Sequence, residues 1–160
     1  EDAYEAVKEN FNEAKSSLEK VDPKEMRVDQ VLGFTEHTIE SIFTIGSAKC
    51  QEGDYPTALS LFIVLTILQP NDFDLWYRTA IIAQGCEDFD LALRAYAEAV
   101  KLNEGLVEAY LFSAECYLMK GLQQEAKEAY LKAEKVVETA SPVSDETRKL
   151  LDDLKIMLTT

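Results

Sequence analysis

Three stretches, "GDYPTALSLF" at residues 53–62, "EDFDLALRAY" at 87–96 and "GLQQEAKEAY" at 121–130, share one spacing. In each of them an alanine stands four residues before an aromatic side chain. These pairs recur every 34 residues and are Ala58 with Phe62, Ala92 with Tyr96, and Ala126 with Tyr130. A fixed period of this length is typical of stacked structural repeats.

The same period extends to the residues upstream of each pair. Large and small side chains alternate there in the manner of the first helix of a tetratricopeptide repeat, at Ile42-Ile45-Gly46, Trp76-Thr79-Ala80-Ala83 and Tyr110-Ser113-Ala114-Tyr117. The expected helix-to-helix turns hold Gly53, Glu87 and Gly121. Small residues let two helices approach closely. The sequence therefore predicts three repeats, at 39–72, 73–106 and 107–140, each a helix, a short turn and a helix.

The end of the chain predicts a cover for the last repeat. Pro142 stops the preceding helix and Ser144 can cap a new one. One apolar stripe follows, formed by Leu150, Leu151, Leu154, Met157 and Leu158. A terminal repeat needs its exposed apolar side covered, so we expect residues 141–160 to form a capping helix.

The first 35 residues predict an amphipathic helix followed by a linker. Apolar residues recur in steps of three and four, at Tyr4, Val7, Phe11, Ala14, Leu18 and Val21. This stripe could cap the first repeat, or Tyr4, Val7, Phe11 and Leu18 could form a self-association surface that yields a homodimer. Residues 28–34 fit either a short element or a linker, and Thr35 can cap the first repeat helix. The predicted fold is all-α, a right-handed helical solenoid of three tetratricopeptide repeats with these two flanking helices.

Charge and hydropathy narrow the class of partner. The chain has 30 acidic and 16 basic residues, for a net charge of -14, which disfavours nucleic acids and anionic membrane surfaces. The longest apolar run, at 59–68, is about half the ~20 residues that a membrane-spanning helix needs. No secretory signal opens the sequence, so we expect a cytoplasmic protein without direct membrane insertion.

Few residues could support catalysis or bind a metal. Cys50, Cys86 and Cys116 form no Cys-x-x-Cys pair and have no histidine close in sequence, which favours free thiols in a reducing compartment. His37 is the only histidine and stands at a helix start, away from any serine or cysteine that it could activate. No glycine-rich phosphate loop is present. We expect no enzymatic activity, no cofactor and no metal.

A concave face is where a solenoid of this kind binds a peptide. In the repeat family, the second, fifth, ninth and twelfth residues of each first helix line that face, and their spacing of 3, 4 and 3 lies along one side of a helix. We take these positions as the candidate client-binding groove: Glu40, Phe43, Ser47, Cys50, Asp74, Tyr77, Ile81, Gln84, Glu108, Leu111, Glu115 and Leu118. The apolar members predict a groove floor, although any one of them alone could equally belong to the core. Glu40, Asp74 and Glu108 could attract a basic segment, but an acid in a first helical turn is also favoured by the helix dipole.

Residues 36–137 resemble the translocator chaperones of bacterial type III secretion, the class with three tetratricopeptide repeats. The segments that carry the resemblance are "GDYPTAL", "LQPNDFDLW", "CEDFDLALRAYAEAVKLN" and "EAYLFSAECYLMKGLQQEA". The resemblance implies a protein without catalytic activity that holds an extended segment of a hydrophobic secretion client in its concave groove before export. It also implies a bacterial cytosolic location and, in many members, a dimer formed through the N-terminal region.

The sequence does not decide which kind of client the groove binds. Ser47 and Cys50 stand where members of this class often carry larger aromatic residues, so the client could be a membrane-inserting translocator or a gatekeeper of the secretion channel. The alternative is a scaffold or cochaperone that clamps an acidic peptide with basic residues at these concave positions. Asp74 and Glu108 would repel such a carboxylate, which disfavours that alternative.

Overall fold

The computed structural model describes residues 33–139 and 143–159, and within these residues all regular secondary structure is α-helical. The helices are α3 (Glu36–Gln51), α4 (Tyr55–Leu68), α5 (Phe73–Gly85), α6 (Phe89–Leu102), α7 (Val107–Met119), α8 (Gln123–Thr139) and α9 (Asp145–Thr159). The helices α5 and α7 begin at the first residues of the second and third predicted repeats, whereas α3 begins three residues before Ile39. The predicted N-terminal helix, with Tyr4, Val7, Phe11 and Leu18, lies outside the described residues.

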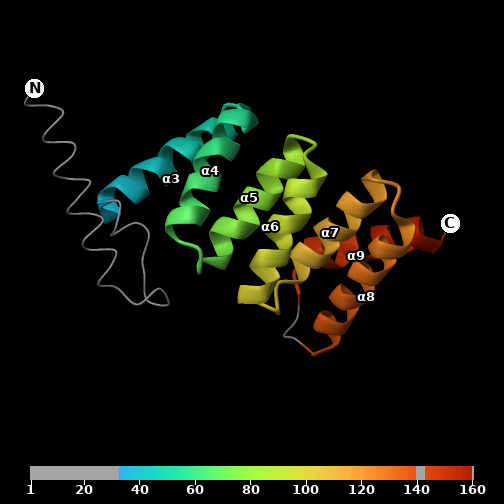
Figure 1. The fold of residues 1–160 in the computed structure, drawn as a ribbon. Coiled ribbons are helices and arrows are strands. Elements are labelled where there is room, and N and C mark those ends of the chain that lie inside the picture. Colours follow the sequence, from blue (N-terminus) through green and yellow to red (C-terminus); the bar gives the residue numbers. More distant parts are fainter. Residues whose placement is uncertain (1–32, 140–142, 160) are drawn as a thin grey trace, which may run out of the picture.

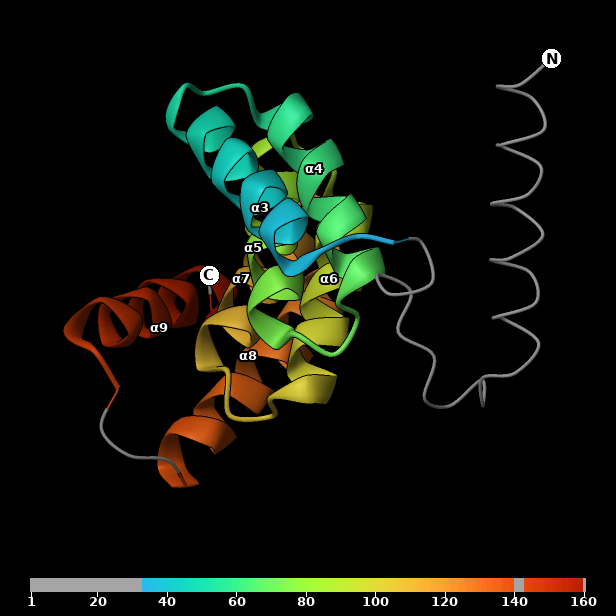
Figure 2. The same cartoon turned by 90° about the vertical axis from the view of Figure 1, so that its left-hand side faces the viewer.

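The described helices form three antiparallel pairs that follow one another along the molecule (Figure 1). Within the pairs, α3 packs on α4, α5 on α6 and α7 on α8, and the pairs are joined by contacts of α4 with α5 and of α6 with α7. Figure 2 shows α3, α5 and α7 one behind another, with α4 and α6 to their right. This arrangement is the helical solenoid that the 34-residue period predicts.

Short turns set the angle within each pair. Gly53 and Gly121 have φ angles of 79° and 74°, in the left-handed region that glycine adopts without steric cost. Glu87 occupies the equivalent turn with φ 60°, although it carries a side chain. The local sequence thus places the helix reversals where the repeat pattern expects them.

Polar side chains cap the helices that open and close the described chain. The Oγ1 atom of Thr35 accepts a hydrogen bond from the backbone N–H of Thr38, at 3.2 Å. At the other end, the Oγ atom of Ser144 accepts from the backbone N–H of Thr147, at 3.1 Å. Both predicted caps are confirmed, and each satisfies one of the N–H groups that a helix start leaves without an intrahelical partner.

The alanine and aromatic pairs lie in the core. Ala58, Ala92 and Ala126 are fully buried, and the aromatic side chains four residues later are between 0% and 5% exposed. In the first repeat, a Cβ atom added to Gly46 would lie 2.9 Å from the Phe62 ring, which is closer than packing allows. The small residue at this position therefore makes room for the aromatic side chain of the second helix, as the sequence predicts.

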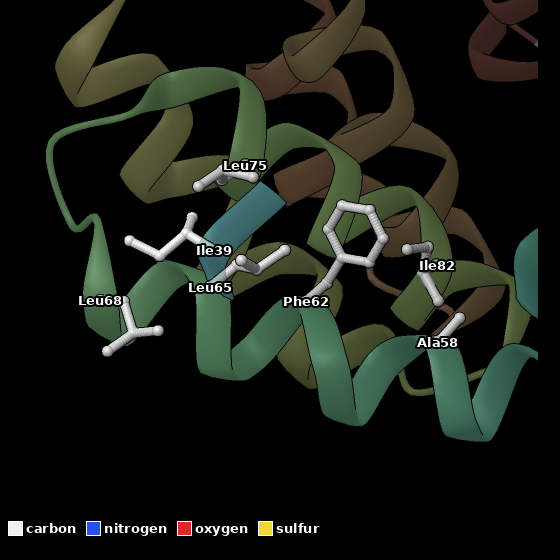
Figure 3. Packing of buried hydrophobic residues seen from close by; sticks show 7 residues of the cluster. All are labelled: Ile39, Ala58, Phe62, Leu65, Leu68, Leu75 and Ile82. Carbon is white, nitrogen blue, oxygen red and sulfur yellow. The ribbon is translucent and has the colours of Figure 1, made fainter. Parts of the chain in front are cut away.

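One core cluster joins the first pair to the second. Figure 3 shows its side chains, which α3, α4 and α5 direct toward one another: Ile39, Ala58, Phe62, Leu65, Leu68, Leu75 and Ile82. A second cluster connects α5, α6 and α7, and a third includes Leu154 of α9. The three clusters thus follow one another along the solenoid, and α9 closes its C-terminal end against α7 and α8. No described helix combines the length and the apolar character that crossing a bilayer requires.

Candidate peptide-binding face

The first helices of the pairs, α3, α5 and α7, carry all twelve predicted groove residues. We call the surface that these helices line the concave face. Two pockets of this face lie between α3 and α5, in the first two repeats. The part that belongs to α7 differs, because α9 packs against it.

The first pocket lies between the N-terminal halves of α3 and α5 and has a volume of about 430 Å³. Three predicted groove residues, Glu40, Phe43 and Asp74, line it together with the core residues Ile39 and Leu75. The Phe43 ring also meets the Phe62 ring edge-on, with centroids 5.6 Å apart. The core thus holds one side of Phe43 while its other side contributes to the pocket.

The second pocket, of about 290 Å³, lies farther along the same two helices. Three predicted groove residues, Ser47, Cys50 and Ile81, line it, and Phe62 and Ile82 extend the wall from the core. The Ile81 side chain is 42% exposed despite being apolar. The small Ser47 and Cys50 side chains, at positions where larger residues would fill the space, leave this pocket open.

Arg78 lies between the two pockets, and the sequence analysis did not select it. Its Nε atom donates to the Oδ2 atom of Asp74 at 2.6 Å, and its guanidinium carbon lies 5.5 Å from the centroid of the Phe43 ring. It also lines the second pocket. An aspartate four residues before an arginine on one helix forms an ion pair readily, so the i, i+4 spacing was the signal that could have identified it.

Tyr77 is the central predicted groove residue, yet it lines neither of these two pockets. It is half-buried against an aromatic cluster, with ring centroids 6.1 Å from Tyr96 and 6.4 Å from Phe112. Burial, followed by the nearby carboxylates of Glu108 and Asp74, raises the pKa of Tyr77 to about 12. Its hydroxyl group is therefore neutral at physiological pH, and the side chain shares the properties of a core and of a surface residue.

A chain of hydrogen bonds crosses the concave face between the second and third repeats. The Tyr96 hydroxyl donates to Gln84 Oε1 at 2.9 Å, and Gln84 Nε2 donates to Glu115 Oε2 at 3.2 Å. Partial burial raises the pKa of the Glu115 carboxyl, against a smaller lowering by the Gln84 hydrogen bond. Two predicted groove residues thus act on one another and join α5 to α7.

The third repeat contradicts part of the groove prediction. Leu111 is fully buried, in the same cluster as Leu154 of α9, so it belongs to the core and not to an open groove floor. Glu108 accepts a hydrogen bond from the Thr147 hydroxyl at 2.7 Å, and Leu118 packs against the same cluster. The predicted capping helix, α9, therefore packs in one cluster with Leu111 and bonds to Glu108, whereas Glu115 and Leu118 are half-buried.

The cysteines and the single histidine show no arrangement that would activate them. Desolvation raises the pKa of the Cys50 and Cys86 thiols, and it raises the pKa of buried Cys116 to about 12, so all three are protonated thiols. His37 is exposed at the start of α3. Among the residues that the structure describes, no three His, Cys, Asp or Glu side chains are grouped as a metal would require.

Comparison of the structure with solved structures finds a consistent group of similar folds. The chain superposes on the type III secretion translocator chaperone SycD of Yersinia enterocolitica with a TM-score of 0.66 and 21% identity, covering 84% of this chain and 97% of that one. PcrH from Pseudomonas aeruginosa gives a TM-score of 0.70 and 20% identity, with coverages of 79% and 95%. A type III secretion complex from Aeromonas hydrophila gives 0.70 and 19%, with coverages of 84% and 87%.

Two of these chaperones have also been solved with bound segments of other proteins. SycD is known in complex with a peptide of the translocator YopD, and PcrH with the chaperone binding region of PopD. Neither the family models nor the curated proteins give a match to the sequence. At these identities the likeness establishes the fold, and the chain has the helical solenoid of the type III secretion translocator chaperones.

Proposed function

We propose that this protein is a type III secretion chaperone that binds an extended segment of a secreted client on its concave face and keeps the client soluble and export-competent in the bacterial cytosol. The observation that carries the proposal is the pair of open pockets between α3 and α5, in which partly exposed side chains such as Phe43 and Ile81 stand beside residues of the core. The two pockets follow one another along the same pair of helices, as binding of an extended chain requires. The client is a hydrophobic translocator or a gatekeeper protein.

Solved structures of proteins with the same fold also support this function. SycD, which has this fold, binds a peptide of the translocator YopD, and PcrH binds the chaperone binding regions of PopD and PopB. The Ile81 side chain, 42% exposed beside the second pocket, offers apolar surface that a client can cover. Peptide anchors that enter such pockets supply most of the binding energy of an interface.

The proposed function needs no chemical step. Binding removes apolar client surface from water, and release returns the client to the export machinery unchanged. We therefore infer that the protein is not an enzyme and uses no cofactor. The described residues act by shape and charge, through Phe43, Ile81 and their neighbours.

A tetratricopeptide scaffold or cochaperone that binds another peptide is the alternative function. A clamp for a peptide carboxylate needs cations on the concave face, and Arg78 is the one lysine or arginine among the residues that line the two pockets. Asp74 already pairs with Arg78 at 2.6 Å, and Glu40 lies in the adjoining pocket. A carboxylate ligand would therefore meet like charge, which favours the secretion-chaperone function.

Self-association is a separate part of the proposal. The apolar stripe of Tyr4, Val7, Phe11 and Leu18 lies outside the described residues, and a homodimer through it remains a prediction. SycD has been solved as a dimer, in an arrangement described as alternative. Replacing Phe11 and Leu18 with glutamate should convert a dimer to a monomer in sedimentation, whereas a stripe that only caps the first repeat would leave the mass unchanged and lower the melting temperature.

Two isoleucine variants test the client site. Ile81 is 42% exposed beside the second pocket, and Ile67 is 54% exposed on α4, so glutamate at either position should leave the fold intact. We expect Ile81→Glu to lose the client when the tagged protein is purified from bacteria that carry its secretion system and partners are identified by mass spectrometry. Ile67→Glu should retain it.

If Ile81→Glu retains the same client, the two pockets are not part of the client-binding site. Loss in both variants would place the client on the outer surface of α4 as well. Recovery of an acidic C-terminal peptide as the partner would favour the cochaperone alternative. Each purification is read against the melting temperature of the variant, which separates lost binding from lost folding.

A further inference from the structure

We propose that the two pockets select different side chains of the bound segment: the first takes a lysine or arginine, and the second takes an uncharged apolar side chain. This inference rests on the proposed function, because it requires that an extended peptide segment occupies the concave face. It adds the chemical identity of the two peptide side chains that enter the pockets, and the order of these side chains along α3 and α5.

The first pocket combines an apolar floor with an acidic rim. Its floor is formed by Ile39, Phe43, Leu65 and Leu75, and its rim carries Glu36, Glu40, Asp72 and Asp74. No lysine or arginine lines it. A long cationic side chain buries its methylene stem against apolar surface while its charge stays near water, which is the combination that this pocket offers.

Glu36 and Glu40 are the rim carboxylates that a ligand can engage. Asp72 caps α5 by accepting from the backbone N–H groups of Asp74 and Leu75, at 2.9 and 3.4 Å. Asp74 pairs with Arg78 at 2.6 Å. The carboxylates of Glu36 and Glu40 form no hydrogen bond or ion pair with the rest of the described chain, and both residues are exposed. A cation between them would therefore gain two charged partners without breaking an existing contact.

The second pocket lacks the acidic rim of the first. No acidic residue lines it, and Arg78 is its one charged residue. Ile81, Ile82 and Phe62 make most of its wall apolar. A lysine or arginine placed here would lie beside the Arg78 guanidinium group, and like charges across an interface are unfavourable. The second pocket therefore rejects what the first pocket accepts.

The contrast between the pockets, and not the number of acids, carries the inference. With a net charge of -14, an acidic rim is common on this surface. The second pocket, on the same two helices, is nevertheless lined by no acidic residue and by one arginine, Arg78. The guanidinium carbon of Arg78 lies 5.5 Å from the centroid of the Phe43 ring, which belongs to the first pocket. Opposite preferences in adjacent pockets fix both the identity and the direction of a bound segment.

A random dodecapeptide library displayed on phage, selected on the full-length protein, tests this directly. We expect enriched sequences to share one lysine or arginine at a constant distance from one apolar residue. The same selection on the Glu36→Gln/Glu40→Gln variant should keep the apolar residue and lose the basic one. Glu125→Gln/Glu138→Gln is the matched control, because it removes the same charge from exposed positions of α8 and should keep both.

A synthetic enriched peptide and its norleucine analogue give the magnitude. Replacing the basic residue of the peptide with norleucine should weaken binding to the parent protein about 2- to 5-fold in fluorescence anisotropy, since exposed ion pairs contribute modestly. The analogue and the original peptide should bind equally to the Glu36→Gln/Glu40→Gln variant, because this variant has already lost the carboxylates that pair with the basic residue of the peptide.

Three outcomes overturn the inference. Enrichment of apolar residues without a basic one would disprove the assignment of the first pocket and leave the proposed function standing. A basic preference that persists on Glu36→Gln/Glu40→Gln would place the cation elsewhere. If no sequence is enriched, or if enrichment survives Ile81→Glu unchanged, the concave face is not a peptide site and the proposed function fails with the inference.

Discussion

Phe43 in the first repeat and Leu111 in the third occupy the same position of their helices. Phe43 lines an open pocket, whereas Leu111 is fully buried in a cluster with Leu154 of α9. Glu40 and Glu108 repeat this contrast one helical turn earlier, since Glu40 is exposed and Glu108 bonds to Thr147. The repeat register therefore sets the direction of a side chain, and the neighbouring element decides whether a ligand can reach it.

This difference assigns separate roles to the two ends of the solenoid. A terminal repeat exposes apolar surface that must be covered, and α9 covers it in this chain. In the third repeat α9 packs with Leu111 and bonds to Glu108, whereas the two pockets described above lie in the first two repeats. The following predictions test that division, beginning with the largest expected effect.

Alanine substitutions at the equivalent positions Phe43 and Leu111 should lower the stability of the protein by different amounts. We expect Leu111→Ala to lower the free energy of unfolding by about 2–5 kcal/mol, because it leaves a cavity in a packed cluster. Phe43→Ala should cost less, about 1–2 kcal/mol, because one side of its ring already faces water in the pocket. Urea denaturation of both variants measures the difference, and equal losses would contradict the division.

Tyr77→Ala should affect both binding and stability, because the residue lies at the boundary between the two regions. We expect a loss of about 1–3 kcal/mol in client affinity and a loss of about 1–2 kcal/mol in stability, as its ring contacts with Tyr96 and Phe112 disappear. Tyr77→Phe should preserve both quantities. If the alanine variant is destabilised as strongly as Tyr96→Ala, for which ~3–5 kcal/mol is expected, Tyr77 is a core residue.

Removing an acid from each region should distinguish a structural carboxylate from an accessible one. Glu108→Ala should lower the free energy of unfolding by about 0.5–1.5 kcal/mol through the loss of its hydrogen bond to Thr147. Glu40→Ala, at the equivalent position of the first repeat, should stay within about 0.5 kcal/mol of the parent. A larger cost at Glu40 would show that this carboxylate supports the fold and is not free for a ligand.

The smallest effect concerns pH. Burial raises the pKa of Glu115 above its usual value of 4.5 in the folded protein, so the charged form is less favourable when folded than when unfolded. At pH 7 this charge lowers stability, and the penalty disappears as the carboxyl becomes protonated at acidic pH. We expect Glu115→Gln, which can still accept from Gln84, to be more stable than the parent at pH 7, with the difference shrinking toward pH 4 in thermal melts. A difference independent of pH would mean that charge is not its cause.

The local features of the fold were predictable from the sequence because they depend on neighbouring residues. The 34-residue period located the helix pairs. Thr35 and Ser144, as capping residues, identified the starts of α3 and α9. The alanine and aromatic positions indicated the core directly, since Ala58 and Phe62 are both buried and the ring of Phe62 packs against the small Gly46. Each of these features is encoded within one repeat or between adjacent helices.

The candidate site was predictable only in part, because access depends on how distant elements pack. Leu111 has the character of a groove residue in sequence, and its burial follows from the position of α9, more than 30 residues later. Arg78 escaped selection because it lies one residue beyond the assumed register, although its spacing from Asp74 indicated an ion pair. Glu36 and Asp72 line the first pocket from helix ends, which a pattern restricted to helix interiors omits.

Site-specific photocrosslinking tests the central claim most directly. Ser47 and Glu115 occupy the same position in the first and third repeats and are both half-buried, so a benzophenone amino acid at either site samples equivalent surfaces. In bacteria that produce the client, we predict a client crosslink from position 47 and none from position 115. A crosslink from position 115 alone, or equal crosslinks from both positions, would contradict a client site confined to the first two repeats.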